Sequence, residues 1–117
     1  MPKPTIQFLQ KPSCTTCRKG KAFLKKQGVT LKLRSLDDQR LSEQELDELI
    51  GDRDHLAFLN PRNELYRSRK MKDHPPTRPE AVRLMAANPN LIRRPVVIRG
   101  ASIVLGYDQP AYRKLLQ

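Results

Sequence analysis

The N-terminal third of the chain alternates between short apolar runs and one longer amphipathic stretch. Residues 5–9 are mainly apolar and predict a strand, and residues 15–27 predict a helix that ends at a glycine. In residues 30–34, leucines alternate with basic side chains, as in a strand whose Leu31 and Leu33 share a buried face. Strand, helix and strand in this order predict a right-handed βαβ unit. The expected buried face of the helix carries Gly20, Phe23 and Leu24.

The middle of the chain has the pattern of several short helices. Ser42 and Glu45 have the spacing of a capping box, in which each side chain bonds the backbone of the other residue. Two short helices are expected between residues 56 and 71. Thr77 and Glu80 form a second capping box, which opens a helix that runs to about residue 87.

The last part of the chain returns to β structure. Residues 96–98 and 103–105 are apolar runs separated by a glycine turn, which predicts a hairpin. Asp108 can cap a final helix with Pro110 in its first turn. The residues expected to cover the sheet from this helix are Ala111, Leu115 and Leu116.

Together these elements predict an α/β fold, in which a βαβ unit is followed by helices and then by a C-terminal β-hairpin and helix. This is the order of a thioredoxin-like fold with an enlarged middle. We expect a single domain over residues 1–117, with a helical insertion at about residues 40–88.

The net charge of +11 is unevenly distributed along the sequence. Residues 1–36 contain nine Lys or Arg and no acidic residue, whereas residues 37–54 contain eight acids against two arginines. Such a charge suits anionic small substrates, nucleic acid or an acidic protein partner, and it is equally compatible with a solvated surface that has no partner. Aromatic residues make up only 5% of the chain and no helix-turn-helix pattern is present, so direct DNA binding is not expected.

The remaining composition bears on the cellular compartment. No apolar run approaches the roughly 18 residues of a membrane span, and residues 1–4 lack the apolar stretch of a signal peptide. We therefore expect a cytoplasmic protein without membrane association, in which a permanent structural disulfide is rare.

The two cysteines of the chain, Cys14 and Cys17, stand at the start of the first predicted helix. A disulfide between them would close almost no loop and would stabilise the fold little. At a helix N-terminus, free N–H groups and partial positive charge stabilise a thiolate, and Arg18 and Lys19 add positive charge. The pattern predicts a redox pair in which Cys14 is the nucleophile and Cys17 forms the disulfide with it.

Two other interpretations of the pair remain open. A zinc site would need further ligands, but His55 and His74 have a spacing that matches no common zinc finger, so no metal is expected. Alternatively, the cysteines are inert side chains of the core, because free cysteine is often simply buried.

Three segments, residues 11–19, 58–62 and 88–98, resemble the arsenate reductase/Spx family, and a Gly-Tyr step before the last helix is also similar. The resemblance covers nearly the whole chain. It implies a thioredoxin-like sheet with a helical insertion and no bound cofactor. It also implies that Pro95 is a cis-proline facing the cysteine.

The same resemblance implies roles for two arginines. In arsenate reductases of this family, the cysteine at the position of Cys14 attacks the oxyanion, and arginines at the positions of Arg62 and Arg94 would hold it. A guanidinium group binds a tetrahedral oxyanion through two parallel hydrogen bonds and lowers the pKa of a nearby thiol. Tyr107 stands where these enzymes carry a third arginine.

Two functions follow from the resemblance. The first is a thiol-dependent oxidoreductase that acts on a small oxyanion or thiol substrate, with glutathione/glutaredoxin or thioredoxin as the electron donor. The second is a redox-sensing regulator like Spx, which binds the C-terminal domain of the RNA polymerase alpha subunit. Asp54 stands where the regulators carry a glycine, so the oxidoreductase is the preferred hypothesis.

Overall fold

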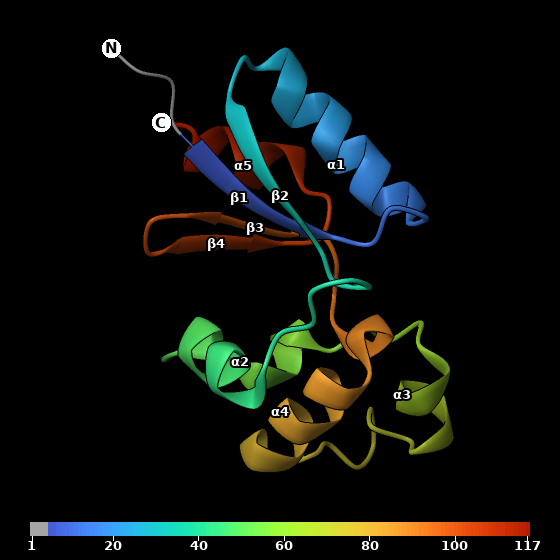
Figure 1. Ribbon diagram of the computed structural model, residues 1–117. Helices are drawn as coiled ribbons and strands as arrows, with labels where there is room; N and C mark the ends of the chain where they lie inside the picture. The colour runs from blue at the N-terminus through green and yellow to red at the C-terminus, as the bar shows by residue number, and fades with distance from the viewer. Residues whose placement is uncertain (1–4) are drawn as a thin grey trace. The chain divides into compact units, whose positions relative to one another are not determined.

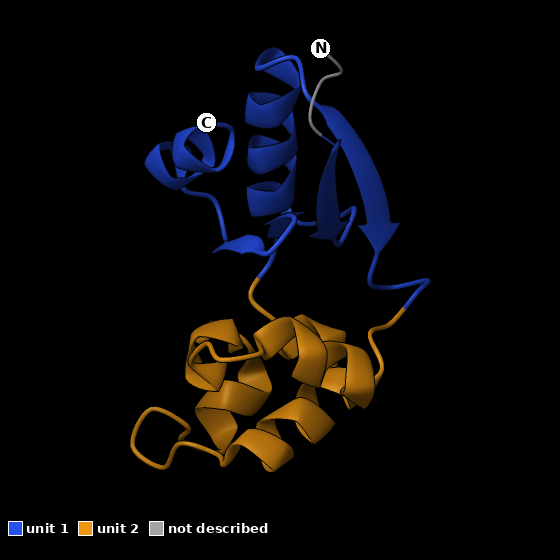
Figure 2. Cartoon of the chain, turned by 90° about the vertical axis from the view of Figure 1, so that its left-hand side faces the viewer, with its two compact units in different colours: residues 1–39, 94–117 blue, residues 40–93 orange. Residues whose placement is uncertain are grey.

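The computed structural model describes residues 5–117; residues 1–4, where we expect no signal peptide, lie outside the described residues. The chain forms two compact units (Figure 2). Unit 1 comprises the residues up to 39 together with residues 94–117, and unit 2 comprises residues 40–93. In chain order, unit 2 interrupts unit 1. The single domain expected over the whole chain stays a prediction.

Unit 1 is a mixed four-stranded sheet with two helices (Figure 1). The strand order is β2-β1-β3-β4; β1 runs parallel to β2, and β3 runs antiparallel to both β1 and β4. The elements are β1 (Thr5–Gln10), α1 (Thr15–Lys26), β2 (Thr30–Ser35), β3 (Val96–Arg99), β4 (Ser102–Leu105) and α5 (Gln109–Leu115). The predicted α/β fold, with its βαβ unit and its C-terminal hairpin and helix, is confirmed.

The core of unit 1 lies between the sheet and α1 and α5, which lie side by side on one face of the strands (Figure 2). The buried side chains of this cluster are Ile6, Phe8, Cys17, Leu24, Val97, Tyr112 and Leu115. On α1 the prediction is confirmed for Gly20 and Leu24, whereas Phe23 is only partly buried. On α5, Tyr112 is fully buried beside Leu115, while Ala111 and Leu116 are partly exposed.

Strand β2 forms one edge of the sheet, and this position corrects one prediction. Leu31 and Leu33 pair with Ile6 and Phe8, so both are on the side of the strand that faces the helices. Leu31 packs against the core, but Leu33 is 43% exposed. The expected buried face of this strand is therefore only half formed, because an edge strand has a neighbour on one side only.

Unit 2 is helical. Its elements are α2 (Glu43–Ile50), the 3₁₀ helix η1 (His55–Phe58), α3 (Glu64–Ser68), α4 (Arg78–Ala87) and the 3₁₀ helix η2 (Pro89–Leu91). The predicted capping box of α2 is present, since Glu45 N donates to Ser42 Oγ at 3.0 Å and Ser42 N donates to Glu45 Oε1 at 3.1 Å. The largest fully buried side chains of the unit are Leu46, Ile50, Phe58, Met85, Leu91 and Ile92.

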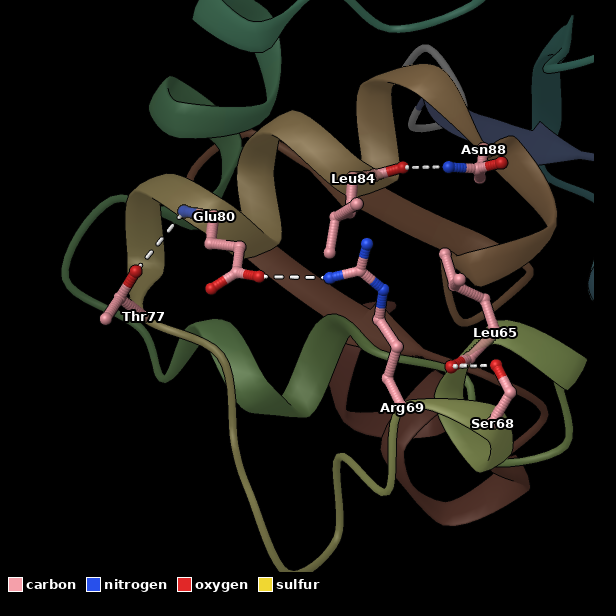
Figure 3. A network of polar contacts seen from close by, with 7 residues as sticks. All are labelled: Leu65, Ser68, Arg69, Thr77, Glu80, Leu84 and Asn88. Atoms are coloured by element: carbon pink, nitrogen blue, oxygen red, sulfur yellow. Dashed lines mark hydrogen bonds and ion pairs between the residues drawn. The ribbon is translucent and has the colours of Figure 1, made fainter.

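Polar contacts connect α3 to α4 within unit 2 (Figure 3). Glu80 N donates to the N-cap Thr77 Oγ1 at 3.4 Å, which is one of the two bonds of the predicted second capping box; the Glu80 side chain turns to Arg69 instead of bonding Thr77 N. The Glu80 carboxylate accepts a hydrogen bond from Arg69, just after α3, at 3.2 Å (Figure 3). At the other end of α4, Asn88 Nδ2 donates to Leu84 O at 3.0 Å. Among residues 5–117, no helix is both long and apolar enough to cross a membrane.

Candidate active site

Cys14 is the N-cap residue of α1. A tight turn places it there, with Cys14 N donating to Lys11 O at 2.9 Å. Its sulfur accepts a hydrogen bond from Cys17 N at 3.3 Å, so the thiol takes the place of the oxygen that usually caps a helix. The side chain is half-buried, which leaves the sulfur within reach of a reactant. A thiolate in this position faces the free N–H groups of the first turn.

The surroundings lower the pKa of the Cys14 thiol. Burial is the largest single influence and acts in the opposite direction, because it disfavours the charged form. It is outweighed by hydrogen bonds from the Cys17 thiol and from the backbone N–H groups of Cys17 and Thr16, together with the positive charge of Arg94. Cys14 therefore has the character of a nucleophile at a lower pH than a free cysteine.

Cys17 lies one turn further into α1 and is fully buried. Burial raises the pKa of its thiol to about 12, and the hydrogen bond to Cys14 and the charge of Cys14 act in the same direction. The two cysteines are free thiols and lie close in space, and their pKa values are shifted in opposite directions, that of Cys14 downward and that of Cys17 upward. This asymmetry suits a pair in which one thiolate reacts first and the other thiol follows.

The segment before β3 brings Arg94 and Pro95 into the same unit as the thiols. The Arg94–Pro95 peptide bond is cis. Gly106 N donates to Pro95 O at 2.9 Å, and the Tyr112 hydroxyl donates to Gly106 O at 2.6 Å. These two bonds connect the proline, the loop after β4 and the buried ring of α5. That Pro95 faces the reactive cysteine, Cys14, stays a prediction.

Tyr112 contacts α1 at Gly20, one turn beyond Cys17. A Cβ atom at Gly20 would lie 2.9 Å from the Tyr112 oxygen and 3.4 Å from Pro95 Cγ, so only glycine fits this close approach without movement. Burial, followed by the charge of Cys17, raises the pKa of Tyr112, which keeps its hydroxyl protonated as a donor. No local sequence pattern indicated a role for Tyr112, because its burial depends on residues far away in the chain.

The remaining predicted residue, Arg62, lies in unit 2 and is exposed; its backbone N donates to Asn60 Oδ1 at 3.1 Å. Within unit 1, the charge of Arg94 acts on both Cys14 and Cys17, and the role of Arg62 at the site stays a prediction. His55 Nε2 lies 3.0 Å from Pro76 O, so a backbone contact accounts for this side chain. Within residues 5–117, no group of three or more His, Cys, Asp or Glu is placed to hold a metal ion.

A cysteine pair at the mouth of the first helix, on a sheet of order β2-β1-β3-β4, defines a protein of thioredoxin-like fold with two adjacent thiols. The ArsC family model matches residues 9–115, and the chain belongs to this family. Among curated proteins it is similar to the global transcriptional regulator Spx of Listeria innocua, with 26% identity over 113 residues. That match covers 95% of this chain and 86% of the relative.

Solved structures give the same assignment. A putative ArsC family related protein from Bacteroides fragilis has 28% identity and a TM-score of 0.83, covering 95% of this chain and 98% of that one. A possible arsenate reductase from Streptococcus mutans has 26% identity and a TM-score of 0.79, covering 97% of this chain and 98% of that one. The resemblance noted in the sequence is thus confirmed at the level of the family, which includes relatives named as regulators and as reductases.

Proposed function

We propose that this protein is a thiol-dependent oxidoreductase in which Cys14 is the nucleophile and Cys17 the resolving thiol. The observation that carries the proposal is that two adjacent thiols have pKa values shifted in opposite directions. The thiol with the lowered pKa, Cys14, is half-exposed at a helix N-terminus. Oxidation of the pair to a disulfide releases two electrons and two protons to the substrate. A thiol reductant of the glutathione/glutaredoxin or thioredoxin kind returns the pair to the dithiol.

The substrate class that we propose is a small oxyanion, such as arsenate, or a thiol-linked molecule. Arg94 supports this choice, because its charge acts on Cys14 and its guanidinium group can bind two oxyanion oxygens at once. Arg62 is proposed as a second ligand on the family pattern. The solved relative from Streptococcus mutans, named as a possible arsenate reductase, favours the same chemistry.

The test is the rate of alkylation of each thiol as a function of pH, measured in Cys14→Ser and Cys17→Ser variants. We expect Cys14 to react with a midpoint below that of a free cysteine, about 8.5, and Cys17, which stays buried when Cys14 is replaced, to react with a midpoint above that value. Millimolar arsenate, phosphate or sulfate should slow alkylation of Cys14. Arg94→Ala should raise the midpoint and reduce the protection, and Arg62→Ala should reduce the protection only. A Cys14 midpoint at or above 8.5 would refute the nucleophile assignment.

A second candidate function rests on the curated relatives, several of which are named global transcriptional regulators. In this alternative the same thiol pair senses redox state, and the protein binds the polymerase alpha C-terminal domain. If the protein is an oxidoreductase, a coupled assay with arsenate or a disulfide should consume NADPH. This consumption should be lost in Cys14→Ser. It should be unaffected by Glu43→Lys/Glu48→Lys, which changes two exposed positions of α2. Tight binding to the polymerase domain without any turnover would select the regulator.

A further inference from the structure

The positive charge of the protein is concentrated in the unit that carries the thiols. Unit 1 contains 13 of the 23 Lys and Arg residues and three of the 12 acids, a net charge of +10, whereas unit 2 has ten against nine, a net charge of +1. Within unit 1, helix α1 has five basic residues and no acidic one. Helix α1 is therefore the most positively charged element of unit 1.

The outward face of α1 is a continuous basic surface. Burial on this helix falls on the side of Cys17, Gly20 and Leu24, and the opposite side is exposed along the whole length. With 100° per residue, the exposed positions form two rows of cations on either side of a line of small residues. The rows are Arg18 with Lys25 and Lys19 with Lys26, and the small residues between them are Thr15 and Ala22. We call these six residues the α1 basic face.

The arrangement of these charges does not serve the helix itself. Arg18 and Lys19 stand near the positive end of the helix dipole, where cations are unfavourable. Lys21 lies three residues after Arg18 and four before Lys25, at spacings where like charges repel. Among residues 5–117, no carboxylate forms an ion pair with any of the four cations of the face. Arg18 Nε donates to the backbone oxygen of Pro12 at 3.4 Å, and no charge of the face is neutralised by this neutral acceptor, so the charges are available to an external anionic surface.

The α1 basic face lies next to the reactive thiol, and this position indicates the kind of partner that binds it. It begins immediately beyond Cys14, and its cations span about 12 Å along the helix, from Arg18 to Lys26. A surface of this size, starting at the reactive thiol, fits a macromolecule that must bring a sulfur atom to Cys14. Nucleic acid would use the same charge, but it offers no sulfur to the thiol, and α1 presents no aromatic side chain on this face for base stacking.

We propose that the α1 basic face docks an acidic protein partner whose disulfide exchanges with the Cys14 thiolate. This proposal rests on the thiol chemistry of the proposed function and names the partner class for it. The Cys14 thiolate attacks one sulfur of the partner disulfide, the S–S bond breaks, and the second sulfur leaves as a thiolate. The Cys17 thiol, after losing its proton to solvent, displaces the partner from Cys14. The partner is released as a dithiol, and Cys14 and Cys17 are left joined by a disulfide.

The probes are two synthetic peptides, each with one cysteine activated as a neutral 2-thiopyridyl disulfide, and with either four Glu or four Gln residues. Release of thiopyridone reports the second-order rate at Cys14. We expect the acidic peptide to react about tenfold faster than the neutral one at low ionic strength, and about twofold faster at 0.5 M salt. The neutral peptide alone tests the thiol chemistry, so its failure to react refutes the proposed function rather than the docking face.

The decisive variants are Lys25→Glu/Lys26→Glu and a matched control, Lys32→Glu/Lys114→Glu. All four positions are exposed and each variant changes the charge of unit 1 by the same amount. Lys25 and Lys26 lie about 16–18 Å along the helix from Cys14, and any change that they cause in the pKa of the Cys14 thiol alters the rates of both peptides equally, so it cancels in the preference for the acidic peptide. Lys32 pairs with Gln7 on the sheet face opposite to α1.

The α1 variant should lose the preference for the acidic peptide, and the control should keep at least half of it. Equal loss in both variants would show that only net charge matters and would overturn the proposal. So would equal rates for the two peptides in the unaltered protein. Submicromolar binding of duplex DNA that is abolished by Lys25→Glu/Lys26→Glu, without any preference for the acidic peptide, would assign the face to nucleic acid instead.

Discussion

Gly20 is the position at which the packing of α1 can be tested most directly. In an exposed helix interior, replacing glycine by alanine stabilises by about 1 kcal/mol, because alanine has the higher helix propensity. At Gly20 the new Cβ would lie 2.9 Å from the Tyr112 oxygen, which is closer than such atoms approach. The tyrosine ring is rigid, fully buried and held by its hydrogen bond to Gly106 O, so it has little freedom to retreat.

The magnitude follows from these opposing effects. Overpacking of a filled core costs about 1–3 kcal/mol, and weakening the bond from Tyr112 to Gly106 adds about 1 kcal/mol. The gain of about 1 kcal/mol in helix propensity offsets part of these costs. Gly20→Ala should therefore reduce the free energy of unfolding by about 1–3 kcal/mol in total. The assay is urea unfolding followed by circular dichroism under reducing conditions. Ala22→Gly, on the exposed face of the same helix, measures the propensity effect without the contact.

A double-mutant cycle isolates the contact itself. In a Tyr112→Phe background the oxygen is absent, and the nearest remaining atoms to the new Cβ are Pro95 Cγ at 3.4 Å and Phe8 Cε2 at 3.6 Å. Gly20→Ala should then cost at least about 1 kcal/mol less than in the unaltered protein. An equal cost in both backgrounds, or a stabilising Gly20→Ala in the unaltered protein, would refute the reasoning.

Two further predictions concern arginines that bond the C-terminal carbonyls of helices. In unit 2, Arg78 donates to Gly51 O at 2.7 Å and to Asp47 O at 3.0 Å, and pairs with the Asp47 carboxylate, so Arg78→Ala should destabilise the protein by about 2 kcal/mol and Arg78→Lys by less. In unit 1, Arg99 donates to Leu115 O at 2.7 Å, and Arg99→Ala should cost about 1 kcal/mol. Urea unfolding measures both, and an unchanged stability would show that water replaces the guanidinium group.

The helix ends could be predicted from the sequence because caps are local. Ser42, Thr77 and Asp108 each accept a hydrogen bond from the backbone N–H three residues further on, as their spacing indicates. The strands β1 and β3 were predictable for a similar reason, since both are interior strands with apolar residues in sequence. These features depend on neighbours within a few positions.

Features that depend on distant contacts could not be predicted in this way. Leu33 has the alternation of a buried strand residue, yet its exposure follows from the edge position of β2 in the sheet. Tyr112 is buried because Gly20 leaves space for its ring on a helix about ninety residues earlier in the chain. Within the site, the spacing of the cysteines indicated their chemistry, but the nearness of Arg94 to Cys14 came only from the family resemblance and the structure.

The opposite acidity of the two thiols implies that they react in a fixed order. Apart from burial, what raises the pKa of Cys17 is its hydrogen bond to Cys14 and the charge of Cys14. Once Cys14 is joined to a substrate sulfur, that charge disappears, while the bond from Lys11 and the charge of Arg94, which lower the pKa, remain. The pKa of Cys17 should therefore fall from about 12 when Cys14 forms a mixed disulfide, so that the second thiol becomes reactive only after the first. The pH dependence of disulfide closure, measured on protein with Cys14 blocked as a methyl disulfide, should have a midpoint below that of the second thiolate to form in the unblocked dithiol protein, followed by its ultraviolet absorbance. Coincident midpoints would mean that burial alone sets the acidity of Cys17 and that the order of reaction depends on access.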